Sequence, residues 1–440
     1  MNVSALVIGG GIAGIQAALD LAESGVKVHL VERSPSIGGR MAQLDKTFPT
    51  NDCSICILAP KMADCYGHPN INVLTYSELI ELHGEAGNFT ARIMKRARYV
   101  DEDRCTGCGE CMDKCPTKVP NEFEYGMSVR KAIYIPFMQA VPRVALIDRD
   151  RCLMLTKGKC GLCQKTCKRG AVDYEMKDVI LEVNIGAVVV AVGFDLWDPS
   201  VASEYGYGKY PNVFTSMEYE RMLNASGPTG GQLRRRSDGE RPKRVAFIQC
   251  VGSRNPSLGH PYCCAVCCMH STKQAIISRE HYDDIESTIF YKDIRTPGKG
   301  FNEYMERARS EYGVRYINSD ATVEEKPENH NLYVLYDVAG KSAREEFDAV
   351  VLAVTLVPRK GVDSLARVLG ISITEHGFFK SADRILRPSD STREGIFLAG
   401  YCASPVDIPE SVAQGSAAAA RAMDVILSTA KRKGEAEVRA

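Results

Sequence analysis

The fold is decided near the N-terminus by the stretch Val3-Ser-Ala-Leu-Val-Ile-Gly9-Gly-Gly11-Ile-Ala-Gly14. An apolar run of strand length leads into glycines spaced as G-x-G-x-x-G, and an alanine-rich stretch typical of a helix follows. A second apolar run, residues 26–31, ends at Glu32. This order of strand, glycine turn, helix, strand and acidic residue is the dinucleotide-binding fingerprint. It predicts an α/β domain that holds a pyrophosphate at the helix N-terminus and ribose hydroxyls at Glu32.

Three further segments favour FAD over NAD as the dinucleotide. Gly38-Gly-Arg40 follows the second strand, as in two-dinucleotide-binding-domain flavoproteins such as thioredoxin reductase. Residues 185–193 resemble the second FAD-domain signature of those proteins, and residues 395–400 resemble their late strand. There, an Asp that binds the ribityl chain often follows the last glycine, whereas Tyr401 stands here. The residues that we expect to contact FAD are Gly9, Gly11, Ile12, Ala13, Gly14, Glu32, Arg33, Gly39, Arg40, Met41, Gly193, Gly400, Ile408, Ser411 and Val412.

The composition is that of an ordinary globular protein with redox chemistry. The chain has 440 residues, 45% of them hydrophobic, and 55 basic side chains balance 55 acidic ones. This balance gives no reason to expect nucleic acid or an anionic membrane as a partner. We expect no signal peptide and no transmembrane segment, since the apolar runs are only strand-length. Seventeen cysteines in such a chain indicate metal and redox chemistry in a reducing cytoplasm rather than a disulfide scaffold.

Eight of the cysteines lie in one segment. The first four follow the C-x2-C-x2-C-x3-C-P spacing of bacterial ferredoxins in Cys105-Thr-Gly-Cys108-Gly-Glu-Cys111-Met-Asp-Lys-Cys115-Pro. The second four are Cys152, Cys160, Cys163 and Cys167, with a wider first gap than the strict pattern. In such ferredoxins the fourth cysteine of each run binds the other cluster. We therefore predict two [4Fe-4S] clusters, one held by Cys105, Cys108, Cys111 and Cys167 and the other by Cys115, Cys152, Cys160 and Cys163.

A third group of cysteines stands where a nicotinamide site would be expected. In this class of flavoprotein a second Rossmann-like domain normally binds NAD(P)H. The corresponding strand, residues 244–249, is followed by Cys250-Val-Gly-Ser-Arg254 rather than by a second glycine fingerprint. A third iron–sulfur cluster is our interpretation, with zinc and buried free cysteines as the alternatives. The predicted ligands are Cys250, Cys263, Cys267 and Cys268, with Cys264 as a substitute or spare.

Together these motifs resemble the HdrA family, the A subunits of heterodisulfide reductase and their homologues in sulfate reducers and other anaerobes. The resemblance also covers residues 52–62 and 407–414, and it extends along essentially the whole chain. It implies a cytoplasmic flavin-bearing subunit that distributes electrons within a complex, by flavin-based bifurcation in several members. The implied partners are B- and C-like subunits of heterodisulfide reductase and donors or acceptors of the hydrogenase, formate dehydrogenase or ferredoxin type, with a homodimeric core as a further expectation. The extra N-terminal domain and C-terminal ferredoxin module of longer members are expected to be absent.

Three side chains have open roles. The resemblance makes Lys273 a candidate to face the flavin, and a solvated helix lysine is the alternative. For Cys53 and Cys56 we consider a flavin-coupled dithiol, partial ligation of a partner's cluster, and a small-residue loop that lines the flavin. Cys65 and Cys402 are expected to be packing cysteines.

The predicted fold is an α/β two-dinucleotide-binding-domain flavoprotein, thioredoxin-reductase-like, with an inserted α+β ferredoxin domain of two [4Fe-4S] clusters. The predicted function is an FAD- and iron–sulfur-dependent oxidoreductase that works within a complex. The alternative is an autonomous NAD(P)H- or ferredoxin-dependent disulfide oxidoreductase that uses Cys53 and Cys56. The FAD-binding domain is expected in three segments, residues 1–97, residues 179–240 with a linker, and residues 357–440. Between them we expect the ferredoxin insert (98–178) and a degenerate NAD(P)H domain (241–356).

Overall fold

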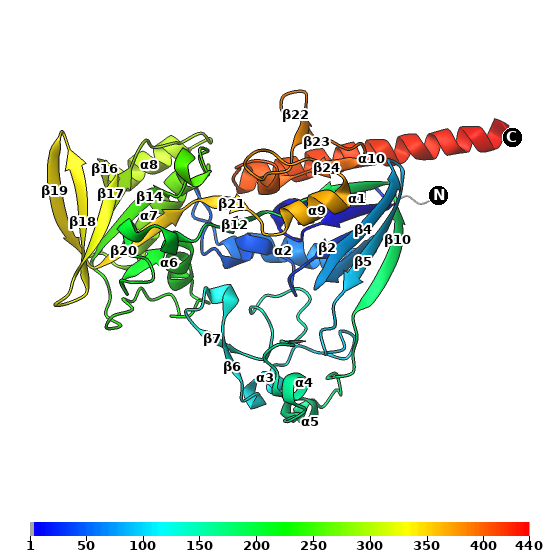
Figure 1. Cartoon of the computed structure of the whole chain (residues 1–440), viewed down its shortest axis with the longest axis horizontal. Coiled ribbons are helices and arrows are strands. Elements are labelled where there is room, and N and C mark those ends of the chain that lie inside the picture. Colours follow the sequence, from blue (N-terminus) through cyan, green and yellow to red (C-terminus); the bar gives the residue numbers. More distant parts are fainter. Residues whose placement is uncertain (1–3, 440) are drawn as a thin grey trace. The chain divides into compact units, whose positions relative to one another are not determined.

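The computed structural model describes residues 4–439, and side chains up to residue 429 (Figure 1). The chain forms two compact units, each built from segments that are not contiguous in sequence. The first unit comprises residues 1–42, 57–194 and 358–440, and the second comprises residues 43–56 and 195–357. Val3, the first residue of the expected N-terminal strand, lies outside the described residues, and the strand runs over Ser4–Ile8.

The first unit is organised by a seven-stranded sheet. Its parallel part puts β1 between β11 and β2, and the alternating strands and helices bury both faces, so Ala5, Leu6 and Val7 are fully buried. The strands, in order across the sheet, are β22 (Ser381–Asp383), β23 (Arg387–Ser391), β24 (Ile396–Leu398), β11 (Ala187–Val190), β1 (Ser4–Ile8), β2 (Lys27–Glu32) and β3 (Ile71–Thr75). The segments around residues 185–193 and 395–400 therefore supply neighbouring strands of this sheet, with β11 beside β1 and β24 beside β11.

Helices and a smaller sheet complete this unit. The antiparallel strands β10 (Val179–Ile185), β5 (Asn88–Lys95) and β4 (Ser77–Glu85) share an apolar core with the large sheet. The helices are α1 (Ile12–Glu23), α2 (Ser54–Gly67), α9 (Val362–Leu369) and α10 (Ile408–Arg439), of which α2 starts in the segment that belongs to the second unit.

The cysteine-rich insert has a core of its own. Its elements are short because the chain turns repeatedly around the cysteines, and α3 and α5 lie side by side (Figure 1). Cys115, Cys152 and Cys163 are buried in this core, which extends from Ala97 to Met176. The elements are α3 (Glu110–Lys114), β6 (Lys118–Pro120), β7 (Val129–Lys131), β8 (Ile133–Tyr134), β9 (Leu146–Ile147), α4 (Leu153–Lys157) and α5 (Leu162–Thr166).

The second unit repeats the parallel α/β theme. Its five-stranded sheet has the order β13 (Val213–Thr215), β20 (Ala349–Val354), β14 (Arg244–Val251), β15 (Glu286–Tyr291) and β16 (Arg315–Asn318). An antiparallel sheet consists of β17 (Ala321–Lys326), β18 (Asn331–Val338) and β19 (Lys341–Phe347), and the helices are α6 (Ser216–Leu223), α7 (Cys267–His281) and α8 (Phe301–Ser310). The strands β12 (Phe194–Leu196) and β21 (Leu356–Pro358) pair where the chain passes from one unit to the other.

The second unit also contains two segments that were predicted to lie in the FAD-binding domain, residues 43–56 and residues 195–240. Residues 195–240 contribute β13, which pairs with β20, and α6. Residues 43–56 belong here because Arg221 and Asn224 of the α6 region donate to the carbonyls of Gln43 and Leu44, over 3.1 and 3.2 Å. These side-chain contacts to backbone leave no pattern in a sequence.

Candidate functional site

The turn after β1 depends on two glycines for reasons of space. Gly9 donates its amide to the Val31 carbonyl over 2.8 Å and has a φ of +108°, which favours glycine. A Cβ atom on Gly9 would lie 2.3 Å from the Ala191 carbonyl oxygen. On α1, a Cβ atom on Gly14 would lie 1.9 Å from the Gly9 carbonyl oxygen. Both residues thus allow strand, turn and helix to approach one another closely.

The middle glycine of the fingerprint, Gly11, borders open space instead. Nothing lies within 4 Å of the position that a Cβ atom on Gly11 would take. Gly11 is the N-cap of α1, and the amides of Ile12 and Ala13 follow in the first turn. An open backbone at a helix N-terminus is the arrangement that accepts a pyrophosphate, so the chain fits the dinucleotide at this point.

Glu32 at the end of β2 is buried and organises the turn. Its carboxylate accepts hydrogen bonds from the Gly10 amide over 2.7 Å, from the Ser34 amide over 2.7 Å and from the Ser34 hydroxyl over 2.6 Å. The neighbouring Arg33 is exposed. Glu32 therefore fixes the glycine turn, and its contact with ribose remains a prediction.

The loop Gly38–Met41 joins the glycine turn to the cysteine-rich insert. The Gly38 amide donates to the Gly10 carbonyl over 2.7 Å. A Cβ atom on Gly39 would lie 2.9 Å from the Cα atom of Gly11. On the insert side, Arg40 donates to the Tyr125 hydroxyl over 3.1 Å, and the backbone before the loop bonds to the Val141 carbonyl. The predicted flavin loop is thus in direct hydrogen-bond contact with the insert.

The C-terminal segment brings a second helix N-terminus to α1. Asp407 and Glu410 cap α10 reciprocally, each accepting the other's amide, over 2.9 and 3.1 Å. Small residues allow the approach, because a Cβ atom on Gly415 would lie 2.5 Å from the Ala13 carbonyl oxygen. Gly400 has a φ of +70° and donates to the Gln414 side chain over 2.9 Å. The remaining predicted contacts of this region are Gly193, which has no neighbouring atom at its Cβ position, and Ile408, Ser411 and Val412 in the first turns of α10.

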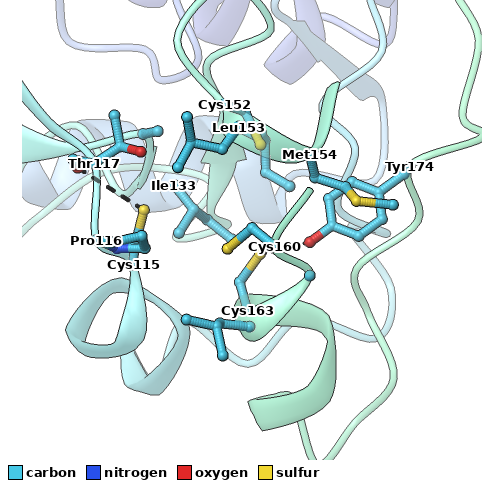
Figure 2. Close-up of a pocket in the computed structure, with 14 residues that line it drawn as sticks. Cys115, Pro116, Thr117, Ile133, Cys152, Leu153, Met154, Cys160, Cys163 and Tyr174 are labelled. Carbon is cyan, nitrogen blue, oxygen red and sulfur yellow. Dashed lines mark hydrogen bonds between the residues drawn. The ribbon is translucent and has the colours of Figure 1, made fainter. Parts of the chain in front are cut away.

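In the insert, four of the predicted ligands line one pocket. Figure 2 shows the thiols of Cys115, Cys152, Cys160 and Cys163 around it, from three separate short segments. The Cys163 sulfur lies 2.9 Å from the Tyr174 hydroxyl. This is the set predicted for the second cluster, and four thiols within a largely apolar lining suit iron–sulfur ligation.

The other predicted ligand set consists of Cys105, Cys108, Cys111 and Cys167. Burial, then the nearby Cys105, Cys163 and Cys108 thiols, raise the pKa of Cys111 to about 12. The Cys167 sulfur accepts the Ala171 amide over 3.4 Å. Glycine caps with positive φ, Gly109 before α3 and Gly161 before α5, start both helices in the same way. The helices that carry the two cysteine runs thus begin with the same local backbone geometry.

A second all-cysteine group lies in the other unit, between the end of β14 and the start of α7. Cys267 is at its centre and is hydrogen-bonded to the thiols of Cys250, Cys264 and Cys268. The hydrogen bond from Cys267 lowers the pKa of Cys250 to about 6, against the effect of burial. Cys263 is only half-buried and accepts the Ala265 amide over 3.4 Å. Cys264, which was predicted only as a substitute or spare ligand, is thus as well placed as Cys263 to serve as the fourth ligand of a cluster.

Lys273 belongs to a buried charged cluster that the sequence did not indicate. It is 1% exposed, and its ammonium pairs with Glu220 of α6 and donates to the Lys46 carbonyl over 3.0 Å. Gln274 and the Asp45 amide also donate to Glu220, over 2.9 and 2.8 Å. The alternative of a solvated lysine is therefore wrong, and the ammonium points at protein groups within this unit.

The charge state of this cluster follows from its contacts. Burial acts to raise the pKa of Glu220, but Lys273 and His270 outweigh it and lower that pKa to about 2. Burial, aided by Lys273, lowers the pKa of His270 to about 4, so its ring is neutral at pH 7. Every residue of α6 is buried, which hides the periodicity that would have singled out Glu220 in the sequence.

The remaining cysteines fall into two kinds. Cys53 and Cys56 form a disulfide at the start of α2. Cys65 and Cys402 are buried, and burial raises their pKa values to about 12 and about 11, as suits packing residues. Among the side chains described, those of residues 4–429, no three from His, Cys, Asp or Glu surround a position for a single metal ion. In the same range, none of the helices combines the length and apolarity that crossing a membrane requires.

Comparison with known proteins defines the class first. The sequence model of the FAD dependent oxidoreductase family matches residues 5–53, and that of the 4Fe-4S binding domain matches residues 98–121. Thioredoxin reductase from Lactococcus lactis superposes with a TM-score of 0.53 over 97% of this chain and 99% of its own, at 13% identity. The T. acidophilum enzyme gives 0.51 over 96% and 98%, at 14% identity. The chain has the fold of a thioredoxin-reductase-like flavoprotein with a ferredoxin domain, which confirms the predicted fold class.

Sequence relatives then narrow this class. The chain is 55% identical over 437 residues to an iron–sulfur A subunit of the CoB–CoM heterodisulfide reductase of Methanopyrus kandleri, covering 99% of this chain and 65% of that protein. It is 49% identical over 436 residues to the A subunit of the H2:CoB-CoM heterodisulfide,ferredoxin reductase of Methanothermobacter marburgensis, with the same coverage. Over 99% of its length the chain is thus homologous to proteins named as heterodisulfide reductase A subunits. It spans just under two thirds of the length of these relatives.

Proposed function

We propose that this chain is the flavin and iron–sulfur subunit of a heterodisulfide-reductase-like complex, with one FAD and three [4Fe-4S] clusters. It would exchange electrons between B- and C-like subunits and a hydrogenase, formate dehydrogenase or ferredoxin type of partner. The names of its relatives mention hydrogen, ferredoxin and the CoB-CoM heterodisulfide, and support this class of partner. When bound, FAD exchanges electrons in pairs or singly and each cluster carries one, which is the chemistry of an electron distributor.

The observation that carries the proposal is the contact between the predicted flavin loop and the insert. Arg40 reaches Tyr125, and Ile37 bonds to Val141 over 2.9 Å. In addition, the buried Arg98 at the start of the insert donates to the carbonyl of Pro35, which precedes the predicted flavin loop, over 2.6 Å. These bonds join the insert to the loop that would hold the flavin, which supports electron transfer between the two proposed redox sites.

A second supporting feature is the loop after β14. The first loop of a nicotinamide domain needs glycines for the pyrophosphate. Here the strand turns at Cys250, which has a φ of +59°, and α7 begins with Cys267 and Cys268. Thiols thus occupy the place of a phosphate cradle, which favours a one-electron centre over direct use of NAD(P)H.

Anaerobic purification with quantification of flavin, iron and sulfide tests the proposal. We expect one FAD and about twelve irons per chain. A content of about eight irons would contradict the proposed cluster at Cys250–Cys268. A content of about four irons would contradict the two clusters of the insert.

Reduction by nicotinamides tests the role within a complex. Rapid stoichiometric reduction of the purified chain by NADH or NADPH would contradict that role and favour the autonomous disulfide oxidoreductase, for which the Cys53–Cys56 disulfide is the supporting observation. Affinity capture from the native host then identifies the partner subunits.

A further inference from the structure

We infer that Cys53 and Cys56 form a thiol–disulfide exchange centre that takes two electrons from an external dithiol. The pair is bonded in the structure, with three residues of sequence separation. Cys56 is exposed and Cys53 is half-buried, so one sulfur is accessible to an attacking thiolate. A stable structural disulfide would be unusual in a protein that also carries more than a dozen free thiols.

The backbone around the disulfide suits reversible reduction. Cys53 directly precedes α2, a helix of 14 residues, and the Cys56 amide donates to the Cys53 sulfur over 3.3 Å. A thiolate at this position gains from the amide and from the helix N-terminus. Cys53 is therefore the better leaving group, and Cys56 is the better point of attack.

The exchange balances in two steps. A thiolate of the external dithiol attacks the Cys56 sulfur, the Cys53–Cys56 bond breaks, and Cys53 leaves as a thiolate in a mixed disulfide between Cys56 and the reductant. The second thiol of the reductant then loses its proton and attacks its own sulfur in the mixed disulfide, which releases Cys56. Two protons pass from the reductant to the two cysteines, the reductant becomes a disulfide, and the reaction is reversible.

The segment before the pair is held in place, so the site is built rather than an accident of a loose loop. Lys46 and Cys53 form an isolated β-bridge. The Thr47 amide donates to the Asp52 carbonyl over 2.8 Å, and the Ser54 amide donates to the Asp45 carbonyl over 2.9 Å. The base of this closed loop is the backbone of residues 45 and 46, which is bonded to Glu220 and Lys273. The buried charged cluster is thus a support for the cysteine pair.

This inference does not rest on the proposed electron-transfer function, because the exchange needs only the two cysteines and a dithiol. Cys65 lies further along the same helix, α2, but offers no such chemistry, since it is buried and its thiol is free. It provides a matched control on that helix.

The experiment follows one tryptic peptide. Cleavage after Lys46 and Lys61 gives the peptide Thr47–Lys61, whose only cysteines are Cys53 and Cys56. The anaerobically purified full chain is equilibrated with dithiothreitol buffers of stepped potential, quenched with acid, alkylated and digested. Mass spectrometry then measures the ratio of intact disulfide to doubly alkylated peptide. We expect a reversible transition with the slope of a two-electron couple.

Variants separate this role from its alternatives. Cys65→Ala should leave the transition unchanged. In Cys56→Ser the remaining Cys53 should be alkylated at every potential. Cys53→Ser/Cys56→Ser should keep the flavin and iron content of the wild type. A peptide that stays oxidised or stays reduced across the whole range would overturn the inference. So would the loss of about four irons from the double variant, because the pair would then be cluster ligands.

Discussion

In each of the two units a parallel strand leads into a helix, but the connecting loops carry different chemical groups. In the first unit β1 leads through Gly9, Gly10 and Gly11 directly into α1, and open space lies at the Gly11 position. In the second unit β14 leads through residues 252–266 into α7, and a buried group of thiols fills the turn. In our proposal the scaffold fixes where a cofactor would sit, whereas the loop decides which cofactor would bind.

The two helix N-termini are used differently as a result. Bare amides at α1 suit a phosphate anion. At α7 the first two residues are Cys267 and Cys268, and a helix N-terminus favours the thiolate form of cysteine. In our proposal the same partial positive charge would stabilise a phosphate anion in one unit and cluster-bound thiolates in the other.

The largest expected effect concerns the thiol group of the second unit. Cys267→Ser removes the thiol that contacts Cys250, Cys264 and Cys268, so we expect the loss of one whole cluster, about four of twelve irons. The measurement is iron per chain after anaerobic purification. Retention of one FAD and about eight irons gives the control within the same sample. An unchanged iron content would mean that this group is not a cluster site.

The next effect tests how α7 is held. Lys273→Met leaves the Glu220 carboxylate buried without its ammonium partner, which we expect to lower the free energy of unfolding by about 3–5 kcal/mol. Urea unfolding followed by circular dichroism measures it. The double variant Glu220→Gln/Lys273→Met removes the unpaired charge and keeps one acceptor oxygen for either Asp45 or Gln274, so part of the loss should be recovered. A small loss in the single variant would contradict a structural role for the pair.

A smaller effect separates the two kinds of glycine in the first unit. Gly14→Ala would normally stabilise a helix, but its Cβ atom meets the Gly9 carbonyl, so we expect a loss of about 1–3 kcal/mol of stability. Gly11→Ala meets no atom and should leave stability unchanged, yet it narrows the space for the pyrophosphate. There we expect at least a roughly tenfold weaker FAD affinity, about 1.4 kcal/mol, in a flavin-binding titration. Equal FAD affinities for wild type and Gly11→Ala would place the pyrophosphate elsewhere.

The smallest effect concerns a side chain next to the thiols of the second unit. Gln249 lies 3.4 Å from the Cys268 sulfur, and its side-chain amide nitrogen has no partner among the described residues. Because Asn and Gln amides can be turned by about 180°, this nitrogen can donate to a cluster-bound thiolate. Gln249→Met removes that hydrogen bond, so the potential of this cluster should fall by about 20–60 mV in a spectroscopic redox titration. The two clusters of the insert serve as the internal control and should not shift.

Much of the fold and of the cysteine placement followed from local sequence patterns. The glycine fingerprint, the two ferredoxin runs and the cysteines after residue 249 are short motifs whose spacing reflects one turn of backbone, so they can be recognised without knowing the tertiary structure. The cluster of Glu220, Lys273, Gln274 and His270 could not be predicted in this way. Its members meet only when α6 packs on α7 and when the backbone of residues 45–46 reaches both. Equally, nothing in the spacing of Cys263 and Cys264 indicates which of the two thiols turns toward Cys267.

The placement of residues 43–56 has a practical consequence for dissecting the protein. The chain crosses between its two compact units at four points rather than two. A contiguous fragment of residues 195–357 would contain α6 and α7 but would lack the carbonyls that Arg221 and Lys273 reach at Gln43 and Lys46. It would expose two cationic side chains that the intact protein buries, and we expect it to be poorly folded. A fragment in which residues 43–56 are fused through a flexible linker to residue 195 should restore these acceptors and fold.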